Sequence, residues 1–177
     1  MHTSAKPRIL AITPGAQYAG LAVLEGESLV WFGVKSFPGR KTPASLIKRA
    51  EEVVCDAVAR HHPQFLVVED VFYAQARMSP AVRALAEAAK RWGRGKGLRV
   101  TSYRPTAVKE RLCAGKNTRM ALGEAVVRRF PFLLWKPMKT WHYRQQMLEA
   151  IALGIVAARD MLAPQGKHRA PERRAHR

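Results

Sequence analysis

Acidic residues are scarce in this sequence of 177 residues, in which 13 Asp and Glu oppose 31 Lys and Arg. The formal net charge is +18, whereas a magnitude of ~2–8 is enough to keep a small domain soluble. An excess of this size indicates a polyanionic partner and favours nucleic acid over a membrane surface. The alternative is a solvated basic surface with no specific function.

Cysteine and long apolar runs are also scarce. The two cysteines, Cys55 and Cys113, exclude a disulfide framework and a four-cysteine zinc site, and they indicate free thiols in a reducing compartment. No apolar run approaches the ~18–20 residues of a membrane span, and residues 1–7 do not resemble a secretion signal. The sequence also has no phosphate-binding GxxxxGK[ST] loop and no HExxH motif. We therefore expect a cytoplasmic protein.

The composition divides the chain into one domain and a short tail. Residues 163–177 carry five basic residues against one acidic residue, contain two prolines and a glycine, and have almost no apolar side chains. This composition predicts a disordered basic tail. The remaining residues, 1–162, keep +14 of the net charge, so the predicted domain is basic in its own right. No internal repeat or second domain is evident.

Hydrophobic periodicity predicts a mixed α/β fold. Short apolar runs bounded by turn residues predict strands, and apolar residues recurring every three or four positions predict helices. The predicted strands are 8–13, 18–24, 29–37, 64–69 and 98–103, and the predicted helices are 44–61, 80–92, 106–112, 118–130 and 143–162. Residues 131–141 are predicted to be irregular. Three antiparallel strands followed by strands that alternate with helices give a mixed sheet flanked by helices, which is the RNase H-like order.

Four short motifs follow one another along this predicted fold. They are ILAITPG at 9–15 with GLAV at 20–23, FLVVEDVF at 65–72, YRP at 103–105 with VK at 108–109, Gly115 and Arg119, and QMLEAIAL at 146–153. In this order they resemble the motifs of the RuvC-like family of Holliday junction resolvases, which belongs to the RNase H-like superfamily. The resemblance covers about residues 8–160.

The resemblance implies a nuclease fold that binds four-way DNA junctions as a homodimer and cuts them with two magnesium ions, in DNA recombination and repair. In the family, the metals lie on four carboxylates: one on the first strand, a Glu ending the fourth strand, and two on the last helix. The matching positions here are Thr13, Glu69, Gln146 and Glu149. Magnesium prefers oxygen ligands, and two close ions need several anionic oxygens.

This sequence departs from the family at two of those four positions. Thr13 and Gln146 offer neutral oxygens that can ligate a metal but add no charge, so the formal charge of the site falls from −4 to −2. The candidate catalytic residues are therefore Glu69 and Glu149, and the candidate metal ligands are these two together with Gln146 and Thr13. Magnesium binding is expected to be weak or absent, and the active site is expected to be degenerate.

Two further residues remain open as members of this site. Asp70 follows Glu69 directly, and it faces the site only if the strand ends at Glu69, because adjacent strand residues point to opposite faces. His142 precedes Gln146 by four residues and shares its helix face only if the helix begins early, in which case it is a candidate base. The alternative for His142 is a surface or capping residue.

Basic and aromatic side chains supply candidate nucleic-acid contacts. By resemblance, Lys109 and Arg119 match family positions that contact DNA, and Phe72 matches an aromatic residue near the junction centre. Lys116 extends this set, and Arg94 and Lys96 lie in a glycine-rich basic stretch beside an aromatic residue, a combination that suits charge and stacking together. The alternatives are a solvated turn for that stretch and a ring packed under its own loop for Phe72.

From these observations we predict a RuvC-like protein that binds branched DNA, specifically four-way junctions, and whose nuclease activity is lost or reduced. The alternative is an active magnesium-dependent crossover junction endodeoxyribonuclease with an altered ligand set. A third hypothesis is a scaffold or RNA-associated protein that keeps the basic fold.

Overall fold

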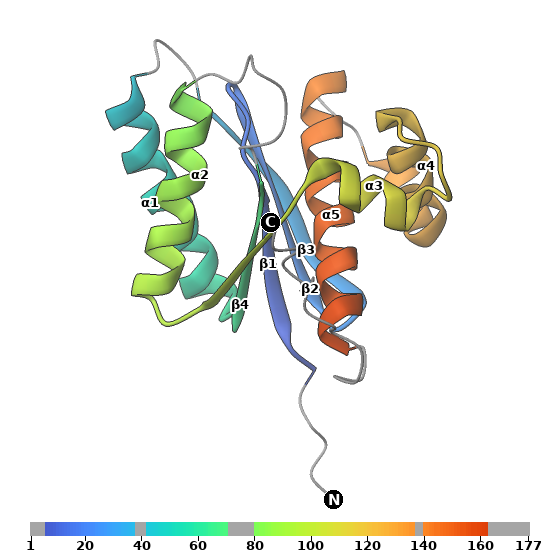
Figure 1. Cartoon of the computed structure of the whole chain (residues 1–177), viewed down its shortest axis with the longest axis horizontal. Helices are drawn as coiled ribbons and strands as arrows, with labels where there is room; N and C mark the ends of the chain where they lie inside the picture. Colours follow the sequence, from blue (N-terminus) through green and yellow to red (C-terminus); the bar gives the residue numbers. More distant parts are fainter. Residues whose placement is uncertain (1–5, 38–41, 71–79, 137–139, 163–177) are drawn as a thin grey trace, which may run out of the picture.

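Five strands form a single mixed sheet with helices on both faces (Figure 1). The computed structural model describes residues 6–37, 42–70, 80–136 and 140–162. The strands are β1 (Arg8–Thr13), β2 (Tyr18–Glu25), β3 (Ser28–Ser36), β4 (Phe65–Glu69) and β5 (Arg99–Tyr103), and their order across the sheet is β3-β2-β1-β4-β5. The predicted fold class is thereby confirmed.

The direction of each strand places the functional edge of the sheet. β1 pairs antiparallel with β2, and β2 with β3, whereas β1 pairs parallel with β4, and β4 with β5. The carboxyl ends of β1, β4 and β5 therefore meet at one edge. Because this edge brings Thr13, Glu69 and Tyr103 onto neighbouring strands, it is the natural place for a site.

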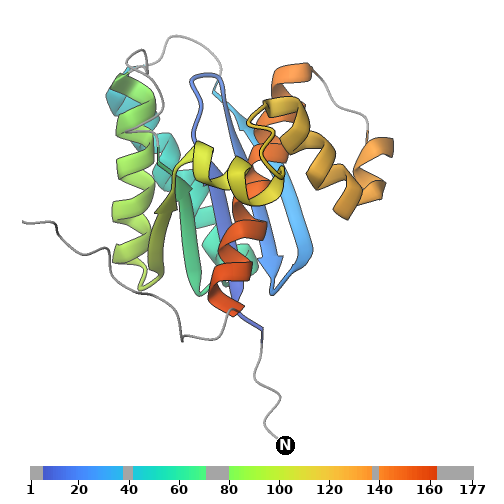
Figure 2. The ribbon, with the colours of Figure 1, turned by 45° about the vertical axis from the view of Figure 1, so that its right-hand side comes forward.

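The helices form two layers over the sheet. They are α1 (Pro43–His61), α2 (Pro80–Gly95), α3 (Pro105–Leu112), α4 (Arg119–Arg129) and α5 (Trp141–Leu162), with a short 3-10 helix η1 (Pro131–Trp135). Figures 1 and 2 show α1 and α2 on one face, α5 and α3 on the other, and α4 on the outer side of α5. None of the described helices has the length and hydropathy needed to cross a membrane.

Burial of both sheet faces explains why the central strands are continuously apolar. Residues of β1 and β4 contribute alternately to a core under α1 and α2 and to a core under α5. Helix α5 is buried over nine successive residues, from 150 to 158, because α4 and α3 cover the side that the sheet does not. The buried side chains of α2 pack in the core on the opposite face of the sheet, against α1 and the strands.

Two predicted boundaries were wrong. Helix α2 continues to Gly95 instead of ending at residue 92, because Gly93 lets the helix approach the sheet: a Cβ there would lie 2.4 Å from a methyl carbon of Leu66. The predicted irregular segment 131–141 contains η1, and α5 starts at Trp141, two residues before its predicted start. The predicted tail, 163–177, and Phe72 lie outside the described residues.

Candidate active site

The four positions implied by the sequence lie where β1 and β4 end against α5. Thr13 is the last residue of β1 and Glu69 the last residue of β4, while Gln146 and Glu149 lie on α5, which packs across the sheet. Because Gln146 and Glu149 are three residues apart, they share one side of the helix. This edge of the sheet is the end away from the chain's N-terminus in Figure 1.

Thr13 holds the strand to the helix. Its side chain is fully buried, and its Oγ1 donates a hydrogen bond to the backbone carbonyl oxygen of Gln146 at 3.1 Å, with the Oε1 of Gln146 at 3.4 Å. Gly20 on β2 makes this approach possible, since a Cβ there would lie 2.0 Å from the same carbonyl oxygen and 2.6 Å from Thr13 Oγ1. The hydroxyl of Thr13 therefore links β1 to α5 through its hydrogen bond, and little free space surrounds it.

Glu69 lies in a desolvated position between charged neighbours. Burial raises its pKa to about 8, and the nearby Glu149 carboxylate adds to the rise, while Arg119 and Lys109 oppose it. Glu69 is therefore mostly protonated at pH 7. A neutral carboxyl group offers a cation much less attraction than a carboxylate does.

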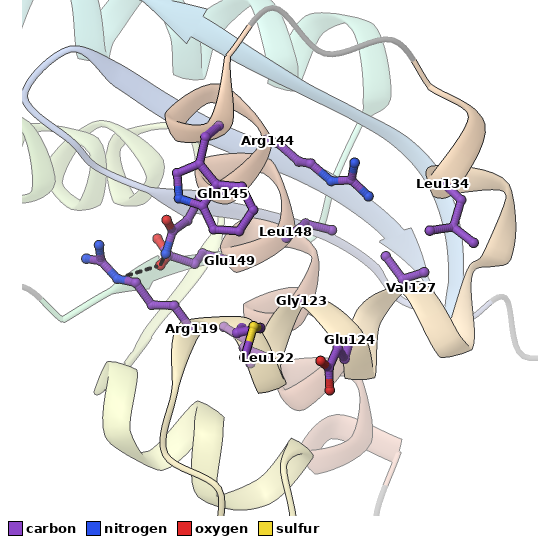
Figure 3. Close-up of a pocket in the computed structure, with 12 residues that line it drawn as sticks. Arg119, Leu122, Gly123, Glu124, Val127, Leu134, Arg144, Gln145, Leu148 and Glu149 are labelled. Carbon is purple, nitrogen blue, oxygen red and sulfur yellow. Dashed lines mark hydrogen bonds and ion pairs between the residues drawn. The ribbon is translucent and has the colours of Figure 1, made fainter.

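Glu149 is held by protein groups. Its side chain is 12% exposed, the Nε of Arg119 lies 3.4 Å from its Oε1, and the Nε2 of Gln145 donates a hydrogen bond to the same oxygen at 3.1 Å. Burial raises the pKa of Glu149, and Arg119 and Gln145 counter that rise by stabilising the carboxylate. Figure 3 shows the contact between Arg119 and Glu149 as a dashed line.

These residues do not fit a two-magnesium centre. Such a centre needs several anionic oxygens, but Thr13 and Gln146 are neutral and hydrogen-bonded to each other, and the Glu149 carboxylate is paired with a guanidinium. Across the part of the chain that the structure describes, no three His, Cys, Asp or Glu side chains converge as metal ligands. A cleavage step on a pair of metal ions therefore does not fit this set of side chains.

Neither of the two open residues completes the carboxylate set. β4 ends at Glu69, and the backbone N–H of Asp70 donates to the carbonyl oxygen of Tyr103 at 2.8 Å, but Asp70 forms no three-ligand cluster with Glu69 and Glu149 within the described ranges. His142 lies in the first turn of α5 and is exposed. It lines a polar groove together with Gln146, so the helix does begin early enough to place the two side by side.

Comparison with known proteins shows which structures share this fold. No protein-family model matches the chain. A crossover junction endodeoxyribonuclease RuvC from Koribacter versatilis is 27% identical over 116 residues, a match that covers 58% of this chain and 65% of that protein's length. A structure of Thermus thermophilus RuvC in complex with a Holliday junction substrate has a TM-score of 0.69 and 20% identity, and covers 89% of this chain and 96% of that one. The chain is similar to RuvC in sequence and has the RNase H-like fold of the RuvC structures.

A second structural likeness supports this assignment of fold. The yeast mitochondrial Holliday junction resolvase is 11% identical to the RuvC-like chain, with a TM-score of 0.67, and the match covers 88% of this chain and 80% of that one. At such low identity the agreement reflects the fold alone. The particular side chains at the sheet edge are therefore properties of this chain.

The predicted nucleic-acid contacts of the RuvC-like chain fall at two ends of the sheet. Lys109 on α3 and Arg119 at the start of α4 both influence the charge state of Glu69, and Lys116 is exposed in the loop between their helices. Arg94 and Lys96 lie before β5, at the opposite end of the sheet. The Nζ of Lys96 lies over the Trp92 ring, 5.1 Å from its centroid, in a cation–π contact.

Three residues at this edge were missed from the sequence. Trp141, Arg144 and Gln145 lie in the first turns of α5 and line grooves beside Glu149. Trp141 and Gln145 precede Glu149 by eight and four residues, which is the spacing of one helix face. Arg144 and Gln145 already lie inside the predicted helix 143–162, and a start two residues earlier would have added Trp141 to the helix face of Gln145 and Glu149.

Proposed function

We propose that this RuvC-like chain binds branched DNA, and four-way junctions in particular, with nuclease activity that is lost or reduced. The observation that carries the proposal is the ion pair of Arg119 with Glu149, next to the desolvated Glu69. Protein groups supply the positive charge that metal ions would otherwise provide. The site thus keeps the position of a RuvC-like centre without its anionic ligand set.

Charge and accessibility support DNA binding. Arg119 is 68% exposed although it contacts Glu149, so its guanidinium can also reach a phosphate oxygen, with the bidentate geometry that guanidinium groups favour. Lys109 is close enough to Glu69 to act on its charge and adds a second cation to the same edge. The net charge of +18 attracts any nucleic acid, and the two cations at this edge of the sheet provide specific contacts for its phosphates. The relative solved with a Holliday junction substrate supports a branched ligand over a linear one.

The alternative is an active magnesium-dependent crossover junction endodeoxyribonuclease with an altered ligand set. Its ligands would be Glu69, Glu149, Gln146 and Thr13, and the proximity of the two carboxyl groups favours it, since the Glu149 charge acts on Glu69. The engagement of the Thr13 hydroxyl with the Gln146 carbonyl oxygen weighs against it. Catalytic roles for Glu69 and Glu149 belong to this alternative.

A homodimer follows from the same proposal. A four-way junction has two-fold symmetry, so a symmetric pair of chains presents one site to each of two equivalent strands. Light scattering of the purified full chain, alone and with a junction, is expected to give a mass of two copies. A monomer under both conditions would remove the dimer from the proposal.

The experiment compares binding and cleavage on one substrate. A synthetic four-way junction and a linear duplex made from the same arms are titrated with protein in EDTA, and the expected result is tighter binding to the junction. Magnesium or manganese is then added and products are followed on denaturing gels, with little or no cleavage expected. Metal-dependent cutting that Glu69→Gln abolishes and Glu110→Gln preserves would establish the active nuclease instead, since Glu110 is exposed on α3.

A further inference from the structure

An open groove lies beside the carboxylates, between α4, η1 and the start of α5. It has a volume of about 220 Å³, and Figure 3 shows Arg119 and Glu149 at one end and Leu134 at the other. Most of its lining is apolar, with Met120, Leu122, Val127, Leu134, Trp141 and Leu148 as the main contributors. Its volume is below the roughly 300–1,000 Å³ of sites for drug-sized ligands, so it suits a single planar group.

The rim of this groove exposes large apolar side chains to water. Trp141 is 62% exposed, and Met120 and Leu134 are also exposed. Single exposed apolar residues are ordinary, but three of them around one groove mark a surface that is covered in a complex. Trp141 lies in the first turn of α5, so little of the fold depends on its ring.

Gly123 keeps the groove open. It lies inside α4, where glycine destabilises a helix relative to alanine, so a packing or functional role is expected for it. A Cβ at this position would meet only the Cδ1 of Leu148, at 3.3 Å. A longer side chain at Gly123 would therefore extend into the groove, and its absence leaves room for a ligand.

A second groove, with mixed walls that are more polar than those of the first, adjoins it. It has a volume of about 260 Å³ and is lined by the 15–18 loop, His142 and Gln146. Arg119, Trp141 and Gln145 line both grooves, so they separate an apolar compartment from a more polar one. A nucleotide has this same division, with a planar base on one side and a charged phosphate on the other.

We propose that Trp141 stacks on an unpaired nucleobase seated in the apolar groove, while Arg119 holds the adjoining phosphate in the more polar groove. This inference rests on the proposed function and names the part of the nucleic acid that the site reads. Two arginines, Arg119 and Arg144, and two carboxylates, Glu124 and Glu149, border the apolar groove, so its own charges balance. The net charge of +18 on the whole chain is what favours a nucleic-acid strand over a peptide. Stacking on an aromatic ring is the common way in which proteins hold unpaired bases.

The test compares two exposed tryptophans on DNA with and without an unpaired base. Trp135 is 85% exposed in the neighbouring η1 and does not line either groove, so Trp135→Ala is the matched control for Trp141→Ala. The DNA is a junction whose crossover carries one unpaired 2-aminopurine, with a fully paired junction as reference. Affinity is measured by titration, and 2-aminopurine fluorescence reports stacking.

We expect Trp141→Ala to weaken binding of the unpaired-base junction roughly 5- to 150-fold, the factor that corresponds to loss of one stacked base. Trp135→Ala is expected to change it less than about 2-fold, Trp141→Phe to recover much of the loss, and Gly123→Leu to weaken binding by filling the groove without unfolding α4. Wild-type protein is expected to quench the 2-aminopurine signal, and Trp141→Ala to leave it unquenched.

Equal effects of Trp141→Ala and Trp135→Ala, or unchanged binding by Gly123→Leu, would overturn the inference and make a protein partner the better occupant. These outcomes are distinct from failure of the proposed function. If wild-type protein binds neither junction, the proposed function fails; if it binds both and Trp141→Ala has no effect, only the nucleobase site fails.

Discussion

Replacing Glu69 by Gln is expected to stabilise the folded chain, and to do so only above acidic pH. The amide has the shape of the protonated carboxyl group and cannot ionise. In the folded chain burial and the Glu149 charge raise the pKa of Glu69 to about 8, from an ordinary value of 4.5. Between these two pH values the folded chain keeps a proton that the unfolded chain has released, so wild-type stability falls as pH rises through this window.

The size of the effect follows from the same two pKa values. At about 1.4 kcal/mol per pH unit, the interval from 4.5 to about 8 sets an upper limit of about 5 kcal/mol. Solvent reaches part of the Glu69 side chain, and Arg119 and Lys109 already support its charged form, so the realised gain is smaller. We expect a difference of about 1–3 kcal/mol between the variant and the wild type at pH 9.

Thermal unfolding at pH 5, 7 and 9, without divalent cations, measures this difference. For a chain of this length, ~1 kcal/mol shifts the midpoint by about 2–4 °C, so the variant should unfold up to about 12 °C higher at pH 9 and close to wild type at pH 5. Glu110→Gln on the exposed side of α3 is the control and should follow the wild-type profile at every pH. A constant difference between Glu69→Gln and wild type across this range, or a variant less stable than wild type at pH 9, would refute the assignment of a desolvated, largely protonated Glu69.

Three further perturbations test the same edge of the sheet. Thr13→Asp places a carboxylate in a fully buried position and is expected to lower the free energy of unfolding by several kcal/mol in EDTA, measured in urea; an unchanged value would show that the position is open to solvent or ions. Gly20→Ala forces a Cβ against the carbonyl oxygen of Gln146 and is expected to lower the free energy of unfolding by about 1–3 kcal/mol or more. The control Gly95→Ala adds a Cβ that meets nothing within 4 Å and should be neutral or stabilising. Equal thermal midpoints of the two variants would refute the close packing of β2 on α5. Removing Lys109 and Arg119 together is expected to reduce the slope of log affinity against log salt by about 2 on junction DNA; an unchanged slope would place the phosphate contacts elsewhere.

The fold follows from the sequence where local pattern and global packing agree. The continuous apolar runs of β1 and β4 indicate burial on both faces, and the sheet between two helical layers confirms it. The predicted end of α2 was wrong because a glycine such as Gly93 is compatible both with a helix end and with close packing inside a helix. Glycine there suggests a helix stop, but in the structure it permits contact with Leu66, and only the tertiary packing distinguishes the two.

The sequence predicts which positions meet at this edge of the sheet, and it does not predict their charge state. Spacing along the chain places Glu69 at a strand end and Glu149 on a helix, and the structure puts both at one edge of the sheet. The contact of Arg119 with Glu149 joins two residues that are thirty positions apart and lie on different helices, and the pKa of Glu69 depends on how closely those helices cover it. Neither quantity is encoded in a local pattern, so neither could be inferred from the sequence.

The charges at this edge predict that DNA binding does not depend on metal ions, in contrast to binding at a site with four carboxylates. Where four carboxylates face a phosphate backbone, they repel it until cations neutralise them. Here the cations Arg119 and Lys109 face one paired carboxylate and one mostly protonated carboxyl group, so the local charge is already positive at pH 7. Junction affinity should therefore be as high in EDTA as in magnesium at matched ionic strength, and a requirement for magnesium would show that Arg119 does not neutralise Glu149 in the complex.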